Sequence, residues 1–180
     1  MQYITCHDVV HRDLAARNIL VFEELDPADP RSVRVKVSDF GLSRPGCYYQ
    51  RTGAVTEALP VRYMPPEAIQ RNKWSEKSDV WAFGVLLWEV ATLGEIPYFV
   101  NSDGEVKAGV CSGALRLPCP EGLPEVIFKG IIEPCWAKRA ADRPTFASLR
   151  TAILEAQLEL HAASIKPSEG TKIYGGVFIT

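Results

Sequence analysis

The chain has 180 residues, 47% of them hydrophobic and 23% charged, and its formal net charge is −2. This length allows a substantial core in one domain, and the charge gives no reason to expect nucleic acid or an anionic membrane as a partner. The five cysteines include no C-x-x-C pair, which argues against a disulfide framework or a zinc site and favours a reducing compartment. We expect no signal peptide and no membrane contact by this segment, because the most apolar stretch is far too short to span a bilayer.

Two short strands are predicted in the first quarter of the chain. Residues 19–22 are a continuous apolar run that predicts a buried strand, and residues 33–37 alternate with period two and predict its partner. Such a hairpin would begin next to Asn18 and end next to Asp39, so both could reach one site. Residues 43–57 are polar and without a period, and they predict a mobile loop.

The remainder is predicted to be mainly helical. Ser78 is the expected N-cap of a helix that runs to about Leu93 and is terminated by Gly94. The apolar residues of this helix cover every side, which predicts a central position. Ser102 opens a capping-box sequence, and Thr145 is the expected cap of a last amphipathic helix. The inner face of that helix is predicted to contain Leu149, Ile153, Ala156 and Leu160. We find no repeat or linker, and residues 161–180 predict a flexible tail.

Residues 11–18, which read His-Arg-Asp-Leu-Ala-Ala-Arg-Asn, carry the strongest functional signal. They place a carboxylate, Asp13, five residues before a side-chain amide, Asn18. Phosphoryl transfer requires a group that orients the attacking hydroxyl and oxygen ligands for Mg²⁺. The run resembles the catalytic loop of protein kinases, and its Ala-Ala-Arg interior resembles that of tyrosine kinases.

Four more segments resemble protein kinases in the expected order. Asp39-Phe40-Gly41 resembles the metal-binding triplet, and residues 60–67 resemble the segment that seats the substrate, where the family more often has Trp in place of Tyr63. Residues 78–84 resemble the start of the central helix, and residues 135–146 resemble the closing motif. The resemblance implies a mainly α fold with a few short β-strands, the C-terminal lobe of the bilobal protein kinase fold, over residues 1–160.

The resemblance implies a role for each residue of the active site. Asp13 would accept or orient the proton of the substrate tyrosine, and Arg17 would lie beside its phenol. Asn18 and Asp39 would hold Mg²⁺ (or Mn²⁺) on ATP, and Leu20 would lie beneath the adenine ring. The loop has no Lys, which favours tyrosine over serine or threonine as the acceptor.

Other residues are assigned supporting and regulatory roles by the same resemblance. An ion pair between Glu67 and Arg143 would join the substrate segment to the last helices, and Asp79 would accept hydrogen bonds from the catalytic-loop backbone. A phosphate on Tyr48 or Tyr49 would pair with Arg12 and order the loop. Two further residues, from the catalytic loop and the metal-binding triplet, are assigned structural support: His11 and Phe40.

The catalytic-loop motif begins ten residues after Met1, and no G-x-G-x-x-G follows it. The expectation is therefore a tyrosine kinase fragment that lacks the small, nucleotide-covering lobe and is inactive alone. Its expected partners are that lobe and proteins or peptides bearing tyrosine, and its expected location is the cytoplasm or the cytoplasmic side of a membrane receptor. A non-catalytic binding or scaffold module is the alternative, and a small-molecule phosphotransferase is a more distant one.

Overall fold

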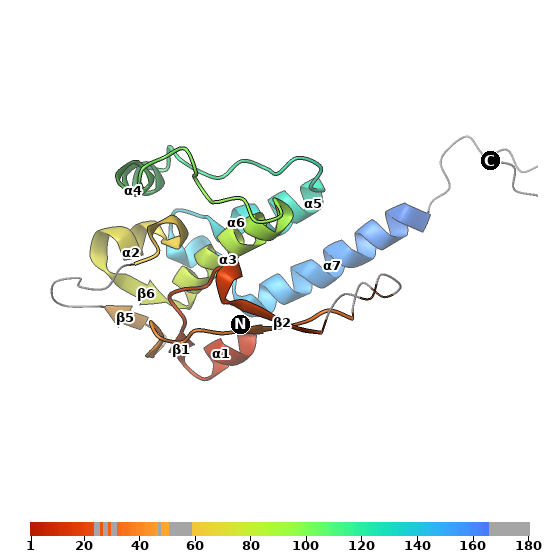
Figure 1. Ribbon diagram of the computed structural model, residues 1–180, viewed down its shortest axis with the longest axis horizontal. Coiled ribbons are helices and arrows are strands. Elements are labelled where there is room, and N and C mark those ends of the chain that lie inside the picture. The colour runs from red at the N-terminus through yellow and green to blue at the C-terminus, as the bar shows by residue number, and fades with distance from the viewer. Residues whose placement is uncertain (24–25, 27–28, 30–31, 47, 51–58, 166–180) are drawn as a thin grey trace, which may run out of the picture.

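The computed structural model describes residues 1–23, 26, 29, 32–46, 48–50 and 59–165. Helix α3 crosses the middle of the molecule, α2 and α4 lie to one side of it, and α7 extends outward (Figure 1). The helices are α1 (Gln2–Cys6), α2 (Pro66–Arg71), α3 (Glu76–Ala91), α4 (Asp103–Ser112), α5 (Glu125–Ile127), α6 (Glu133–Cys135) and α7 (Phe146–Ile165). A π-helical turn, Phe128–Ile132, joins α5 to α6, and 3₁₀ turns occupy Ala16–Asn18, Val61–Tyr63 and Ala140–Asp142.

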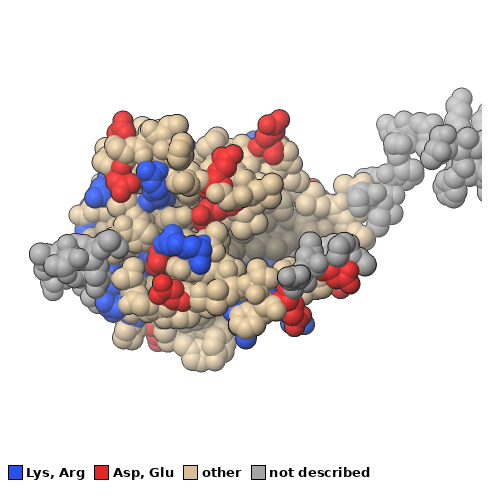
Figure 2. All heavy atoms as spheres, viewed as in Figure 1, with Lys and Arg blue, Asp and Glu red and all other residues tan. Residues whose placement is uncertain are grey.

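In the part of the chain that the structure describes, six short strands form three antiparallel pairs. The pairs join β1 (Val9–Val10) to β4 (Arg44–Pro45), β2 (Ile19–Glu23) to β3 (Arg34–Val37), and β5 (Tyr48–Gln50) to β6 (Lys73–Ser75). The expected mainly helical architecture with a few short strands is therefore confirmed. On the face seen in Figure 2, acidic and basic side chains are interspersed. No helix in the described ranges combines the length and the apolar character that crossing a membrane requires.

Helix α3 supplies the centre of the main core. Ten of its sixteen residues are buried, and its Val80, Trp81 and Val85 pack with residues of α4, α6 and α7. The predicted central position is confirmed, although Val90 is 62% exposed at the end of the helix. The predicted N-cap, Ser78, is wrong. Ser75 caps the helix, since its side chain accepts a hydrogen bond from the Lys77 N–H at 3.2 Å. The Oγ of Ser78, the third helical residue, accepts in turn from the Ser75 N–H at 3.1 Å.

The predicted hairpin is confirmed, with Ile19 opposite Val37 and Val21 opposite Val35. The prediction that its first strand is buried is wrong, because Leu20, Val21 and Phe22 are 48%, 62% and 57% exposed. At the ends of the hairpin next to the body, Ile19 and Val37 pack against the cluster of Leu14, Ala82 and Leu86.

The segment predicted as a loop, residues 43–57, is partly strand. Its backbone pairs with two other segments, Arg44 with Val10 and Tyr49 with Trp74, while residues 51–58 lie outside the described ranges. Backbone hydrogen bonding to β1 and β6 therefore orders part of a segment whose side chains show no period.

Both remaining helices begin where the sequence predicts. Ser102 and Glu105 form a capping box at α4, and the Ser148 N–H donates to Thr145 Oγ1 at 3.1 Å at the start of α7. The inner face of α7 is only partly as predicted, because Leu149 and Ala156 are buried whereas Ile153 and Leu160 are partly exposed. Residues 161–165, expected in the tail, continue α7, and residues 166–180 lie outside the described ranges.

Candidate active site

The segment from His11 to Asn18 connects β1 to β2 and is anchored on α3 by one carboxylate. Asp79 accepts hydrogen bonds from the backbone N–H groups of His11 at 2.7 Å and Arg12 at 2.9 Å. Arg12 has a φ of 72°, so the chain reverses sharply at this anchor. Asp79 is almost completely buried, and this burial raises its pKa to about 7, against the opposing effect of the two donors.

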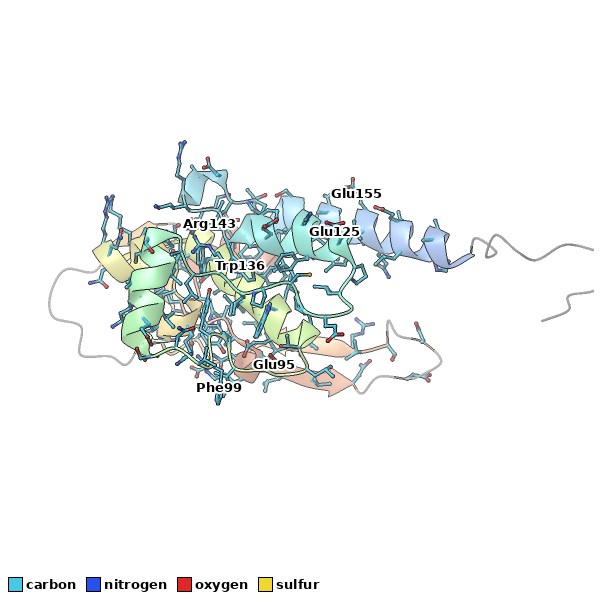
Figure 3. All side chains as sticks on the ribbon, turned by 90° about the horizontal axis from the view of Figure 1, so that it is seen from above. Glu95, Phe99, Glu125, Trp136, Arg143 and Glu155 are labelled. Carbon is cyan, nitrogen blue, oxygen red and sulfur yellow. The ribbon has the colours of Figure 1, made fainter. Side chains whose placement is uncertain are left out.

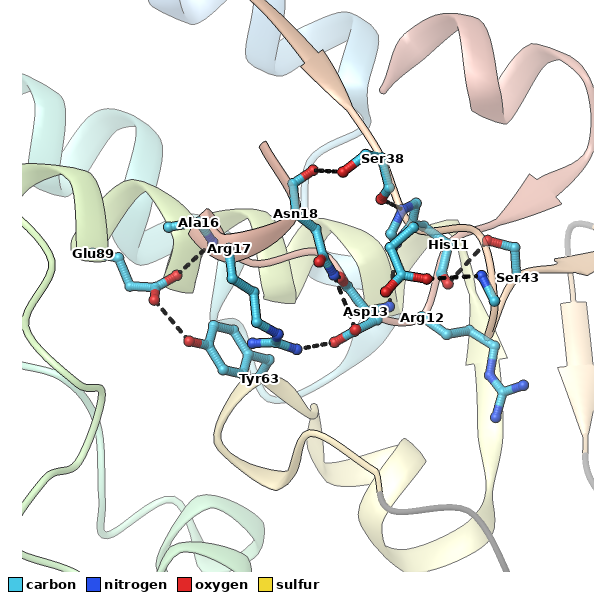
Figure 4. A network of polar contacts seen from close by, with 12 residues as sticks. His11, Arg12, Asp13, Ala16, Arg17, Asn18, Ser38, Ser43, Tyr63 and Glu89 are labelled. Carbon is cyan, nitrogen blue, oxygen red and sulfur yellow. Dashed lines mark hydrogen bonds and ion pairs between the residues drawn. The ribbon is translucent and has the colours of Figure 1, made fainter. Parts of the chain in front are cut away.

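Asp13 is held from two sides by residues of the same segment (Figure 4). Asn18 Nδ2 donates to Asp13 Oδ2 at 2.9 Å and to the Asp13 carbonyl at 2.7 Å. The Arg17 guanidinium pairs with Asp13 Oδ1. The carboxylate is therefore fixed in orientation and lies beside a positive charge.

His11 links Asp13 to the end of β3. Its Nε2 lies 3.1 Å from the Ser38 carbonyl, which can only accept, so Nε2 carries the hydrogen. Its Nδ1 then accepts from the Asp13 N–H at 3.3 Å. Burial lowers the pKa of His11, which keeps the ring neutral in this arrangement, while the Ser38 carbonyl, Asp13 and Asp39 oppose that shift. Both carboxylates therefore lie close enough to His11 to affect the pKa of its imidazole.

Asp39 follows β3 in a left-handed turn with a φ of 59°, and its Oδ1 accepts from the Gly41 N–H at 3.1 Å. The residue before it, Ser38, donates from its N–H and Oγ to the Asn18 carbonyl at 2.9 and 3.0 Å. The end of β3 is therefore tied to the start of β2, where Asn18 lies (Figure 4). The Phe40 ring lies edge-on to the His11 ring, with centroids 5.0 Å apart.

A cavity of about 350 Å³ opens beside Asp13. Its lining comes from the 11–18 segment, from the 3₁₀ turn Val61–Tyr63 and the two residues before it, from the segment after β3 and from the start of α4: Asp13, Arg17, Leu42, Leu59, Pro60, Val61, Arg62, Tyr63 and Asp103. Asn18 and Asp39 do not line it. The predicted site residues therefore divide into a pair at the cavity, Asp13 and Arg17, and a pair beside it, Asn18 and Asp39.

Glu89 and its contact with Tyr63 were not predicted from the sequence. Tyr63 Oη donates to Glu89 Oε1 at 2.7 Å, and the Ala16 N–H donates to Glu89 Oε2 at 3.0 Å. The Arg17 guanidinium lies over the Tyr63 ring, 5.1 Å from its centroid. Burial, followed by the contact with Glu89, raises the pKa of Tyr63, so the phenol stays protonated as a donor. A lone carboxylate in the most apolar stretch of the sequence was the available signal for Glu89.

The remaining predicted residues lie around this centre. Arg143 pairs with Glu67 through two hydrogen bonds of 2.7 and 2.9 Å. Arg12 Nη1 donates to the Leu42 carbonyl at 3.1 Å. Leu20 is half exposed on β2. The backbone of Tyr48 and Tyr49 belongs to β5, and their side chains lie outside what the structure describes.

Asn18 and Asp39 offer the types of oxygen donor that a magnesium ion shared with phosphate oxygens would use. Asn18 turns its Nδ2 toward Asp13, so its Oδ1 is the remaining ligand atom, and Asp39 supplies an exposed carboxylate. Such oxygens are the ligands that Mg²⁺ uses together with substrate phosphates. Within the described ranges, no group of three or more His, Cys, Asp or Glu residues is placed to hold a metal by itself.

The family model described as protein tyrosine and serine/threonine kinase matches residues 1–153. Inactive tyrosine-protein kinase 7 of Gallus gallus is 44% identical over 154 residues, which is 85% of this chain and 14% of the relative. The Homo sapiens protein of the same name is 42% identical over 154 residues, with the same coverage of both chains. Tyrosine-protein kinase SRK3 of Spongilla lacustris is 42% identical over 153 residues, which is 83% of this chain and 42% of the relative. The chain therefore spans less than half the length of each of these relatives.

Proposed function

Because the chain belongs to the protein tyrosine and serine/threonine kinase family, we propose that it is the C-terminal lobe of a protein tyrosine kinase domain, which transfers the γ-phosphate of ATP to tyrosine hydroxyls. The observation that carries the proposal is the fixed Asp13 carboxylate at the edge of an open cavity, with Arg17 beside it. The acceptor hydroxyl would enter this cavity.

In the proposed reaction, Asp13 orients the attacking hydroxyl and takes its proton as the bond to phosphorus forms. Asn18 holds Asp13 in place through its amide nitrogen and, with Asp39, presents oxygen ligands to Mg²⁺ (or Mn²⁺). When bound, the metal neutralises negative charge on the phosphates. Leu20 contributes an apolar surface beneath the adenine ring.

Tyrosine is the proposed acceptor because the 11–18 segment has no Lys and because the cavity wall beside Asp13 is cationic and aromatic. Position 15 is alanine, where a kinase specific for serine or threonine would have Lys, and Arg17 lies over the Tyr63 ring at the wall of the cavity. A phenol entering the cavity would meet both the guanidinium and the aromatic ring.

The 180 residues contain no glycine-rich phosphate loop. We therefore propose that residues outside this sequence cover the nucleotide. Without those residues, the phosphates would lack the backbone amides of such a loop and the adenine ring would be covered on one side only, so few contacts would hold bound ATP. We thus expect calorimetry with Mg²⁺ to show weak or undetectable ATP binding by this chain alone, and micromolar affinity would contradict that expectation.

The test of catalysis uses the longest protein that the gene encodes, incubated with Mg²⁺, ATP and a poly-Glu-Tyr peptide. We expect phosphotyrosine to form, and Asp13→Asn to lower the rate by at least about a hundredfold through loss of the general base. Asp142→Asn removes an exposed carboxylate far from this chemistry and is the matched control, with an unchanged rate. No turnover by the folded full-length protein would overturn the proposal.

A second candidate, a kinase-like binding module without turnover, is favoured by one observation. The relative with 44% identity is named an inactive tyrosine-protein kinase. Turnover by the full-length protein separates the two candidates, because a module of this kind forms no phosphotyrosine and binds its partner equally well after Asp13→Asn.

A further inference from the structure

An apolar groove of about 290 Å³ opens between α1, α3 and the first half of α7. Phe83 of α3 lines it, together with residues of α7 that include Leu149 and Leu154. Among the described residues that line it, Gln2 and Arg150 alone are polar. The groove shares no lining residue with the cavity of the candidate active site, so it is a separate surface.

The apolar surface continues from the groove along the second half of α7. Leu154 is 49% exposed, and Leu158, one turn further along the same face, is 70% exposed. Every side chain from residue 157 to residue 163 is exposed. In both Figure 1 and Figure 3 this end of α7 extends past the other helices. Contiguous apolar surface of this kind marks a site of interaction.

The sequence that follows α7 contains a segment whose composition suits this surface. Residues 173–179 read Ile-Tyr-Gly-Gly-Val-Phe-Ile and carry no charge. Residues 166–172, between α7 and this segment, read Lys-Pro-Ser-Glu-Gly-Thr-Lys and are polar and charged. The sequence after α7 therefore divides into a spacer with the composition of a linker and an apolar segment with the composition of buried chain.

The spacer is long enough for residues 173–179 to reach the groove. From Leu154 to Ile165, the end of α7, the helix rises about 17 Å, at about 1.5 Å per residue. The chain from Ile165 to Ile173 can span up to about 26 Å when it is extended. The apolar segment can therefore turn back along α7 and lie against Leu158 and Leu154.

We propose that residues 173–179 fold back along α7 and bind in the groove between α1, α3 and α7 through their apolar side chains. The spacer holds the segment near the groove at an effective concentration in roughly the millimolar range, so a weak contact suffices to keep the groove occupied. A second copy of the chain has no such advantage, and the strip from Leu154 to Leu158 offers far less area than the roughly 1,200 Å² of a stable protein interface. The contact does not depend on the proposed function.

Hydroxyl-radical footprinting of the full 180-residue chain, read by mass spectrometry, tests the contact because it measures the exposure of side chains. We expect Tyr174 and Phe178 to be oxidised at least about fivefold more slowly than in a synthetic peptide of residues 166–180, as a contact occupied most of the time requires. Leu154→Asp should weaken the contact about tenfold or more, the effect of one leucine-sized group, and so raise both oxidation rates toward those of the peptide. Phe99→Asp alters an apolar side chain that is 74% exposed between α3 and α4, and it is the matched control, with unchanged rates.

A variant of the segment itself completes the test, and circular dichroism verifies that every variant is folded. Phe178→Asp should raise the oxidation of Tyr174 and also that of Leu154, because each partner covers the other. If Tyr174 and Phe178 are oxidised at the peptide's rate in the wild type, the proposal is overturned. It is also overturned if they are protected and Leu154→Asp leaves that protection unchanged, since the segment then binds elsewhere. Protection that increases with protein concentration would mean that the segment binds a second copy, and the folding back would be wrong.

Discussion

Asp79 shows how much one buried carboxylate contributes to this site. Two consecutive backbone N–H groups of the catalytic segment donate to its two oxygens, so one side chain of α3 sets the path of the chain just before Asp13. Leaving such donors without acceptors in the interior would cost about 1–3 kcal/mol each. Asp79 therefore acts on the chemistry through the backbone, without facing the cavity itself.

The raised pKa of Asp79 predicts a specific dependence of stability on pH. Its pKa rises from an ordinary value of 3.8 to about 7 in the fold, so the folded state binds more protons between these values. The contribution of Asp79 to the free energy of unfolding is fully present below pH of about 4 and is lost as the pH rises to about 7. We expect Asp79→Asn to remove this decline, whose slope is at most about 1.4 kcal/mol per pH unit.

Urea denaturation of both proteins between pH of about 4 and about 8 measures this difference. His11 contributes with the opposite sign, because its lowered pKa gives stability above its usual pKa that is lost as the pH falls, and it is present in both proteins. If the pH profiles of the wild type and Asp79→Asn are parallel, the pKa of Asp79 is not raised in the folded state, and the prediction is wrong.

At the residue scale, the sequence predicted groups that belong to short, recognisable patterns. Asp13, Asn18 and Asp39 are of this kind, and their segments are tied together as a hairpin requires. Glu89 was not predicted, because its partners Tyr63 and Ala16 lie 26 and 73 residues away and no local pattern links them. Such contacts depend on how α3 packs, which spacing along the chain does not reveal.

Among the elements, α3 depends on one glycine for its contact with α6. A Cβ built on Gly84 would lie 2.7 Å from Cys135 Cβ and 2.8 Å from Trp136 Nε1. We expect Gly84→Ala to lower the free energy of unfolding by about 1–3 kcal/mol, because this core has no room for a methyl group. Gly130→Ala is the matched control, since nothing lies within 4 Å of its Cβ.

Thermal denaturation of the two glycine variants measures this effect. In a helix, alanine is more favourable than glycine by up to about 1 kcal/mol. The steric cost of the methyl group at Gly84 must exceed this gain for the variant to be less stable. Equal stability of Gly84→Ala and Gly130→Ala would mean that α3 and α6 can move apart at no cost.

The elements also show where local patterns mislead. The sequence around α3 offers two serines three residues apart, and the cap is Ser75 because its backbone is extended, with φ of −160°. The run 19–22 is apolar like a buried strand, yet β2 is exposed, because burial depends on what lies over a strand and not on its composition. Types of element were therefore easier to predict than their boundaries and their surroundings.

Across the whole molecule, the pair of Glu67 and Arg143 joins α2 to the segment that precedes α7. The Arg143 guanidinium has no exposed area and also lies over the Trp81 ring of the main core, 4.9 Å from its centroid. We expect Glu67→Gln to lower the free energy of unfolding by about 3 kcal/mol, because it leaves a buried positive charge without its counter-charge. Guanidinium denaturation measures the loss.

Glu125→Gln provides the comparison for this pair. It removes the same charge from a solvent-exposed pair with Lys129, and its denaturation midpoint should not change. If the denaturation midpoint of Glu67→Gln were also unchanged, water would have to reach Arg143, and apolar packing alone would hold the two helical regions together.

The anchorage of the catalytic segment on Asp79 has a kinetic consequence. The acceptor oxygens exist in the right place only after α3 has formed, 67 residues further along the chain from Arg12. Any opening that unfolds α3 therefore also removes the acceptors of the His11 and Arg12 amides. In deuterated water, the His11 and Arg12 amides should lose their protons no later than the middle of α3 does.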